Sequence, residues 1–180
     1  MIYMLLANGF EEVEALAPLD MLRRAELDAK TVSIEKEKVV LGAHGIPIVA
    51  DLMPSEVEKD ISLLILPGGM PGAERLDASP ITDEFIEKTA KSGGRYAAIC
   101  AAPLVFGKRE MLRGKNAVCY PGFEKYLLGA TLSHERVVTD GSFTTAVGMG
   151  AAIEFGAELV RLLRDDKTKD DMLFAIHAKK

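Results

Sequence analysis

Cys100 is the side chain of this sequence best placed to act as a nucleophile. It ends an apolar run, residues 96–99, and precedes Ala101, Ala102 and Pro103, which are predicted to open a helix. A thiol at a strand-to-helix turn lies near the positive end of the helix dipole, which favours the reactive thiolate. Most isolated cysteines are buried structural residues, so position alone leaves both interpretations open.

Gly68 and Gly69 directly follow residues 61–66, an almost entirely apolar segment. Glycines let the backbone approach a ligand closely and turn its N–H groups toward it, as in an oxyanion hole. A Gly-Gly pair after a strand can also be a plain turn. Because no Gly-Lys-Ser/Thr follows, the pair is not a phosphate-binding loop.

Glu14 is the third candidate, because it borders the apolar stripe of a predicted helix over residues 11–26. Glu11 and Glu12 instead fall with the charged residues of that helix. A half-buried carboxyl beside a cysteine has its charged form disfavoured and can donate a hydrogen bond to a thiolate. The helix pattern alone favours an ordinary solvated carboxylate.

The remaining cysteine and the histidines carry weaker signals. Cys119 falls in a predicted short strand or loop and is interpreted as structural. His44, His134 and His177 lie in polar, loop-like stretches, and no pair has metal-ligand spacing. We therefore expect neither a metal site nor a cofactor.

These candidates need elements to position them, and strand-like runs alternate with helical ones along most of the 180 residues. Strands are predicted over residues 2–7, 30–34, 46–49, 61–66 and 96–99, a hairpin over 136–146, and helices over 11–26, 80–91, 151–164 and 167–177. This alternation predicts an α/β fold, a mostly parallel sheet with helices on both faces, in a single domain over residues 1–180. Ligand sites in such sheets lie at the carboxyl ends of the strands, where all three candidates fall.

Composition excludes several classes of partner. The chain has 22 Lys and Arg against 27 Asp and Glu, a net charge of -5, which argues against a nucleic-acid or acidic-membrane partner. No apolar run approaches the roughly 20 residues that span a bilayer. Residues 1–7 lack a basic leader and are interpreted as a first strand, not a signal peptide. Two cysteines without an export signal indicate a reducing compartment, so we expect a soluble cytoplasmic protein.

The three candidate regions together resemble the DJ-1/ThiJ/PfpI superfamily, most closely its DJ-1 branch. The resemblance is carried by residues 6–14 with 18–20 and 23–25, by residues 66–69, and by residues 98–103. It extends from Ile2 to about Leu163, with the elements in the expected order.

The resemblance implies a flavodoxin-like three-layer sandwich and a homodimer, with the helix over 11–26 in the contact. It implies a reactive Cys100, a protonated partner carboxyl at Glu14, and backbone donors at Gly68, Gly69 and Ala101. The implied function is a protein deglycase or glyoxalase without a cofactor, acting on methylglyoxal-type carbonyls or glycated side chains. The alternative is an oxidative-stress sensor with Cys100 oxidised to a sulfinate, or a redox-regulated chaperone.

Two positions depart from the superfamily pattern. The DJ-1 branch commonly has a histidine before a proline near the cysteine, whereas this chain has Tyr120 before Pro121. A Cys-His dyad, and the proteolysis described for the PfpI branch, are therefore not expected. The Gly-Pro-Gly-Thr stretch of many relatives is replaced here by Val147 to Ala151, so that wall of the pocket differs.

Overall fold

The centre of the protein is a six-stranded sheet, seen in a computed structural model that describes residues 1–58 and 60–178. The strand order is β2-β1-β5-β6-β10-β9, and every neighbouring pair is parallel except β9 with β10. The strands are β1 (Ile2–Leu6), β2 (Ala29–Ser33), β5 (Leu63–Leu66), β6 (Arg95–Ile99), β9 (Val137–Asp140) and β10 (Phe143–Ala146). The predicted α/β fold with a mostly parallel sheet is confirmed.

Both faces of the sheet are buried, because successive side chains point to opposite faces of each strand. In β1 all five residues are buried: Tyr3 and Leu5 join one apolar cluster, whereas Ile2, Met4 and Leu6 join the other. The near-continuous apolar runs of the central strands follow from this double burial.

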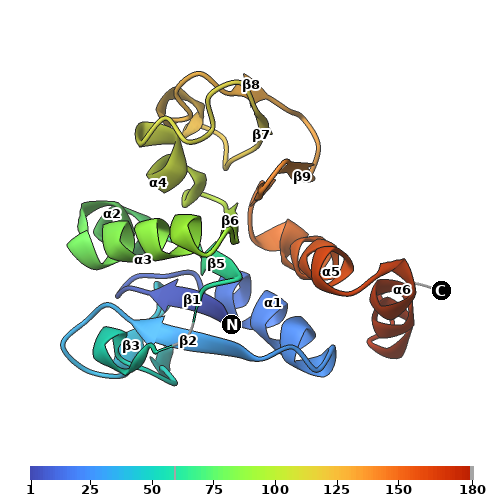
Figure 1. Ribbon diagram of the computed structural model, residues 1–180, viewed down its shortest axis with the longest axis horizontal. Coiled ribbons are helices and arrows are strands. Elements are labelled where there is room, and N and C mark those ends of the chain that lie inside the picture. The colour runs from blue at the N-terminus through green and yellow to red at the C-terminus, as the bar shows by residue number, and fades with distance from the viewer. Residues whose placement is uncertain (59, 179–180) are drawn as a thin grey trace.

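Helices form the two outer layers (Figure 1). Side chains of α1 and α5 belong to one cluster, and those of α2, α3 and α4 belong to the other. The helices are α1 (Glu12–Arg24), α2 (Gly72–Ala78), α3 (Pro80–Lys91), α4 (Pro103–Lys108), α5 (Ala152–Leu163) and α6 (Asp166–Ala175), and α6 packs against α5. Among the described residues, no helix is long and apolar enough to cross a membrane.

Two small strand pairs lie outside the main sheet. One is the antiparallel hairpin of β3 (Val39–Leu41) and β4 (Pro47–Val49), and the other joins β7 (Asn116–Ala117) to β8 (Thr131–Leu132). The strand predicted over residues 46–49 is thus real, but it pairs within the hairpin. Three single-turn helices complete the elements, at Pro54–Glu56, Glu124–Tyr126 and Met149–Ala151.

The hairpin tip is fastened to the start of α1, and this corrects one expectation. Glu12 was expected on the solvated side of its helix, yet it is buried. Its carboxylate accepts hydrogen bonds from the backbone N–H of His44 at 2.8 Å and lies 2.7 Å from His44 Nδ1. The spacing of apolar residues along a helix cannot predict this burial, because the residues that cover Glu12 come from a hairpin distant in the sequence.

The order of the strands alone predicts where a ligand site should lie. From β1 the chain moves to β2 on one side and later returns to β5 on the other, so the order reverses between β1 and β5. The loops after these strands meet there, since the Glu11 N–H donates to the Gly68 carbonyl at 2.9 Å, and this is the usual binding position in doubly wound sheets. The segments that follow β1 and β5 carry Glu14 and Gly68.

The closest helix contact, between α1 and α5, depends on Gly156. A Cβ at this position would lie 2.7 Å from Met21 Sδ and 3.0 Å from the Pro18 Cα. We expect Gly156→Val to lower the free energy of unfolding by about 1–3 kcal/mol, because the packed interface cannot absorb the added volume. Urea unfolding measures it. Gly150→Ala is the control, since its Cβ would meet only Arg136, at 4.0 Å; equal effects would contradict the packing argument.

Candidate active site

Cys100 occupies a strained turn at the end of β6. Its φ is +64°, a left-handed conformation that non-glycine residues rarely adopt. The turn is held on both sides, because the Cys100 N–H donates to the Ala146 carbonyl at 2.9 Å and its own carbonyl accepts from the Tyr120 N–H at 2.8 Å. Strain of this kind is typical of a nucleophile elbow, which lifts a side chain out of the sheet edge.

Glu14 reaches the same place from the first turn of α1 and is only 1% exposed. Its carboxyl forms a hydrogen bond with the Cys100 side chain and accepts another from the Gly68 N–H, at 3.1 Å from Oε2. Glu11 caps the helix, since its carboxylate accepts from the Glu14 N–H at 2.6 Å. The Glu11 N–H in turn donates to the Gly68 carbonyl at 2.9 Å, which joins α1 to the Gly-Gly turn.

Gly68 is required by the close approach of the two reactive side chains. A Cβ there would lie 2.5 Å from Glu14 Oε2 and 2.6 Å from Cys100 Cβ. Both distances are shorter than real Cβ contacts, so any larger residue would push Glu14 and Cys100 apart. The Gly-Gly pair is therefore more than a plain turn.

The three predicted backbone donors divide between the two side chains. The N–H groups of Gly69 and Ala101 hydrogen-bond to the Cys100 sulfur, and both lower the pKa of its thiol. The Gly68 N–H is instead engaged by Glu14. Sequence reasoning placed all three N–H groups at the site. It could not assign each of them to Cys100 or to Glu14, because that assignment depends on the position of the Glu14 carboxyl.

Burial controls the protonation of this pair. It raises the pKa of Glu14 from 4.5 to about 7, and the charge of Glu11 acts in the same direction. Burial also raises the pKa of the Cys100 thiol to about 12, helped by the charge of Glu14 and its hydrogen bond. Desolvation and the neighbouring carboxylate thus act against the thiolate that the position of Cys100 predicts, whereas the N–H groups of Gly69 and Ala101 favour it.

Cys119 has no such surroundings. It is buried in the cluster that includes Phe106 and Leu127, and burial raises the pKa of its thiol to about 12. Both cysteines are free thiols. The two differ in their partners, since Glu14 and two backbone N–H groups face Cys100 alone, and this supports the structural interpretation of Cys119.

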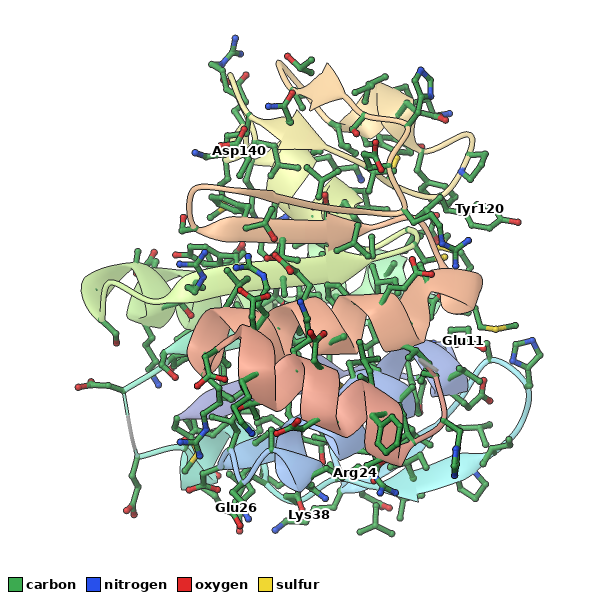
Figure 2. The ribbon with its side chains drawn as sticks, turned by 90° about the vertical axis from the view of Figure 1, so that its right-hand side faces the viewer. Glu11, Arg24, Glu26, Lys38, Tyr120 and Asp140 are labelled. Atoms are coloured by element: carbon green, nitrogen blue, oxygen red, sulfur yellow. The ribbon has the colours of Figure 1, made fainter. Side chains whose placement is uncertain are left out.

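The backbones of Tyr120 and Met149 contact Cys100 and Glu14, and sequence reasoning assigned neither residue a role. Their side chains are 51% and 53% exposed, and Figure 2 shows Tyr120 projecting from the surface. The Met149 N–H hydrogen-bonds to the Glu14 carboxyl. Between them, a Cβ on Gly148 would lie 3.3 Å from the Tyr120 ring and 3.8 Å from Glu14 Oε1. The sequence signal that could have pointed to Tyr120 was the departure from the superfamily pattern at that position.

Glu11, Glu12 and His44 are the group of described residues that could approach a metal ion, with ligand atoms within 4.8 Å of one another. One carboxylate oxygen of Glu11 caps α1, and both carboxylate oxygens of Glu12 bond to His44. The positive end of α1 also disfavours a cation here. The group therefore fastens the hairpin to the helix.

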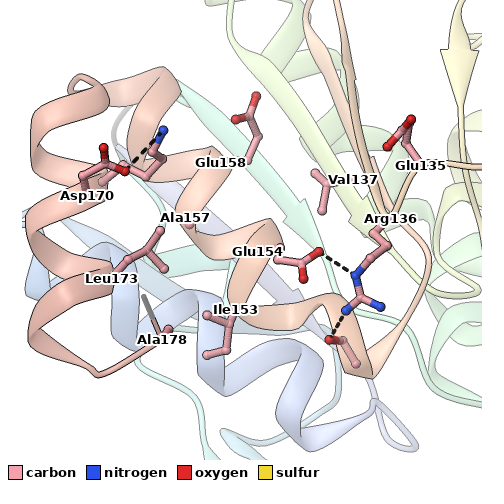
Figure 3. Close-up of a pocket in the computed structure, with 12 residues that line it drawn as sticks. Glu135, Arg136, Val137, Ile153, Glu154, Ala157, Glu158, Asp170, Leu173 and Ala178 are labelled. Carbon is pink, nitrogen blue, oxygen red and sulfur yellow. Dashed lines mark hydrogen bonds and ion pairs between the residues drawn. The ribbon is translucent and has the colours of Figure 1, made fainter. Parts of the chain in front are cut away.

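A separate groove of about 860 Å³ lies between β9, α5 and α6 (Figure 3). Its walls carry an ion pair of Arg136 with Glu154 at 2.7 Å, and its floor includes Leu173. None of the predicted site residues is among the described residues that line it. Size alone does not identify the reactive site, which is set by Cys100 and Glu14.

The Cys100–Glu14 pair can deliver a nucleophile and a proton to the same small molecule. A carboxyl with a pKa of about 7 can accept the thiol proton and return it at neutral pH. The N–H groups of Gly69 and Ala101 are positioned to stabilise an oxyanion or a thiolate beside the sulfur.

The raised pKa of Glu14 makes stability depend on pH. The folded chain holds this proton more tightly than the unfolded chain, so the stabilisation is full below pH 4.5 and is lost as pH rises through about 7. Glu14→Gln stays neutral throughout. Its free energy of unfolding relative to wild type should therefore rise by about 3 kcal/mol between pH 4.5 and about pH 8. Urea titrations at both pH values measure this, and a constant difference would contradict it.

Relatives and solved structures share this architecture. The chain is 36% identical over 171 residues to protein DJ-1 homolog A of Arabidopsis thaliana, covering 93% of this chain and 44% of that protein. It is 30% identical over 166 residues to a deglycase of Pyrococcus abyssi, covering 91% and 99%. The chain thus spans less than half the length of the Arabidopsis protein.

A crystal structure of a cysteine-to-alanine mutant of a DJ-1 superfamily protein from Salmonella typhimurium superimposes with a TM-score of 0.92. Its sequence is 32% identical, and the match covers 98% of this chain and 97% of that one. Oxidised DJ-1 of Toxoplasma gondii gives a TM-score of 0.92 at 31% identity, covering 97% and 96%. Residues 1–162 match the DJ-1/PfpI family, and the chain belongs to that family.

Proposed function

We propose that this protein is a cofactor-independent glyoxalase or deglycase that converts methylglyoxal-type carbonyls through Cys100. The observation that carries the proposal is the hydrogen-bonded Cys100–Glu14 pair, with two backbone N–H groups on the sulfur. An acid–base carboxyl beside a nucleophile is what addition to a carbonyl and the subsequent proton shift require.

The reaction begins with addition of the Cys100 sulfur to the aldehyde carbon of methylglyoxal. The ionised Glu14 takes the thiol proton, and the C–S bond forms as the carbonyl electron pair moves to oxygen. The Gly69 and Ala101 N–H groups stabilise the negative oxygen, which then receives the proton from Glu14. The product is a hemithioacetal.

Glu14 next moves a proton between neighbouring carbons. It removes the proton from the former aldehyde carbon, and the electron pair moves onto the adjacent ketone oxygen to leave an enediolate. Glu14 then returns that proton to the former ketone carbon, while the hydroxyl proton on the first carbon moves to the neighbouring oxygen and a thioester carbonyl forms. One carbon is oxidised and its neighbour is reduced, so no external oxidant is needed. Water hydrolyses the resulting thioester, which releases lactate and restores the thiol. On a glycated side chain the same addition would begin at the adduct carbonyl.

The comparisons support the reaction class. A relative that carries the name deglycase matches this chain over almost its whole length, at 30% identity. Both cysteines here are free, which suits a reducing compartment such as the cytoplasm.

We expect lactate release from methylglyoxal by the wild type and none by Cys100→Ala, because the sulfur forms the covalent intermediate. Glu14→Gln should be slowed by at least about 100-fold, since an amide cannot relay protons. Cys119→Ala is the matched control and should keep wild-type turnover. Activity remaining in Cys100→Ala would contradict the proposal. Absence of turnover with a peroxide-dependent gain of two oxygens on Cys100 would favour the sensor function instead.

We also propose that the protein forms a homodimer through α1 and the β3–β4 hairpin. Exposed apolar side chains gather on these two elements, at Val13, Leu41, Ile46 and Val49. The hairpin is fastened to α1 by Glu12 and His44, so the two elements can present one surface. Exposed apolar side chains grouped on neighbouring elements are typical of a protein interface.

Sedimentation equilibrium at micromolar concentration should give twice the chain mass of 19.5 kDa. Val49→Asp, at a side chain 71% exposed in the chain alone, should shift the protein to monomer because a charge would be buried at the contact. Leu132→Asp, on the distant β8, should leave the mass unchanged. A wild-type mass of one chain would contradict the dimer.

A further inference from the structure

Tyr120 and Met149, here called the rim, have half-exposed side chains on the two segments whose backbones reach Cys100 and Glu14. Each is attached by its backbone to one member of the reactive pair. The Tyr120 N–H donates to the Cys100 carbonyl at 2.8 Å, and the Met149 N–H hydrogen-bonds to the Glu14 carboxyl. Their positions relative to the sulfur and the carboxyl are therefore fixed by the main chain.

Gly148 keeps the space between this rim and Glu14 open. A side chain at 148 would begin 3.3 Å from the Tyr120 ring and 3.8 Å from Glu14 Oε1, so it would fill the gap between them. With glycine there, a substrate substituent can lie against the ring while its carbonyl carbons face Cys100 and Glu14.

The backbone of Tyr120 is held in place, whereas its ring is partly exposed to solvent. The preceding Cys119 is buried, and the Tyr120 carbonyl accepts from the Phe123 N–H at 3.1 Å. The ring nevertheless remains half-exposed, as does Met149. An aromatic ring and a thioether facing water beside a nucleophile can gain apolar contact only when a ligand covers them.

We propose that Tyr120 and Met149 select α-oxoaldehydes with an aromatic or bulky apolar substituent over methylglyoxal. This inference rests on the proposed function and deepens it. The sulfur adds to the aldehyde carbon as before, and the substituent on the ketone carbon packs against the Tyr120 ring. Contact with the ring needs its face and not its hydroxyl, so phenylalanine can replace tyrosine at this position.

Phenylglyoxal and methylglyoxal test the inference, because they share the reacting carbons and differ only in the substituent. The wild type should show the higher kcat/KM for phenylglyoxal, measured as mandelate release, against lactate release from methylglyoxal. Tyr120→Ala should lose about threefold to tenfold on phenylglyoxal, the size of one aromatic contact, and less than twofold on methylglyoxal. Tyr120→Phe should keep the wild-type ratio, as should Phe174→Ala, which removes an exposed ring on α6.

A second measurement separates this inference from the proposed function. Alkylation of Cys100 by N-phenyl iodoacetamide and by iodoacetamide, each normalised to glutathione, needs no turnover. Tyr120→Ala should lower only the relative rate of the phenyl reagent, again by about threefold to tenfold. A shifted alkylation ratio without turnover of either aldehyde would overturn the glyoxalase function and keep the apolar rim. Unchanged ratios in both assays would contradict the selectivity proposed for Tyr120 and Met149, whether or not either aldehyde is turned over.

Discussion

The hydrogen bond between the Cys100 thiol and the Glu14 carboxyl is the interaction on which the site depends. Burial raises the pKa of both groups, so between their two values the pair holds one proton. A shared proton lets the carboxyl act as base when the sulfur attacks and as acid when an oxyanion forms. Neither group alone would have this property: a solvated Glu14 would stay ionised, and an isolated buried thiol would stay protonated.

Keeping that pair together constrains residues from four separate segments. The strained turn at Cys100 is held through the carbonyl of Ala146 and the N–H of Tyr120. Glu14 is held by the cap at Glu11 and the N–H of Gly68. A sheet whose strand order reverses between β1 and β5 brings these segments to one edge. The cost of the strained backbone is offset by the packing of the two helical layers around it.

The candidate site and the groove between β9, α5 and α6 are built from different residues. Glu14 and Cys100 approach Gly68 so closely that a Cβ there would lie 2.5 Å from the carboxyl and 2.6 Å from the Cys100 Cβ. The groove is lined by neither cysteine. In the proposed reaction, a small dicarbonyl would meet this pair beside the half-exposed Tyr120 and Met149.

Apolar patterning was sufficient to predict the layered α/β fold, because buried central strands must be apolar on both faces and each covering helix must carry an apolar stripe. Helix α3 was predicted with its bounds, since Pro80 and the Gly-Gly turn after it are local signals. Local sequence patterns also placed Cys100 and the Gly68-Gly69 turn at strand ends. The family resemblance, rather than the helix pattern, singled out Glu14.

The protonation of the site and the hydrogen-bond partners within it follow instead from tertiary contacts. The burial of Glu12 beneath His44, the assignment of the Gly68 N–H to Glu14, and the raised pKa of the Cys100 thiol all arise from contacts between residues far apart in the chain. A sequence pattern carries periodicity along one element and no distance between two. Desolvation, which dominates both pKa values here, depends on those distances.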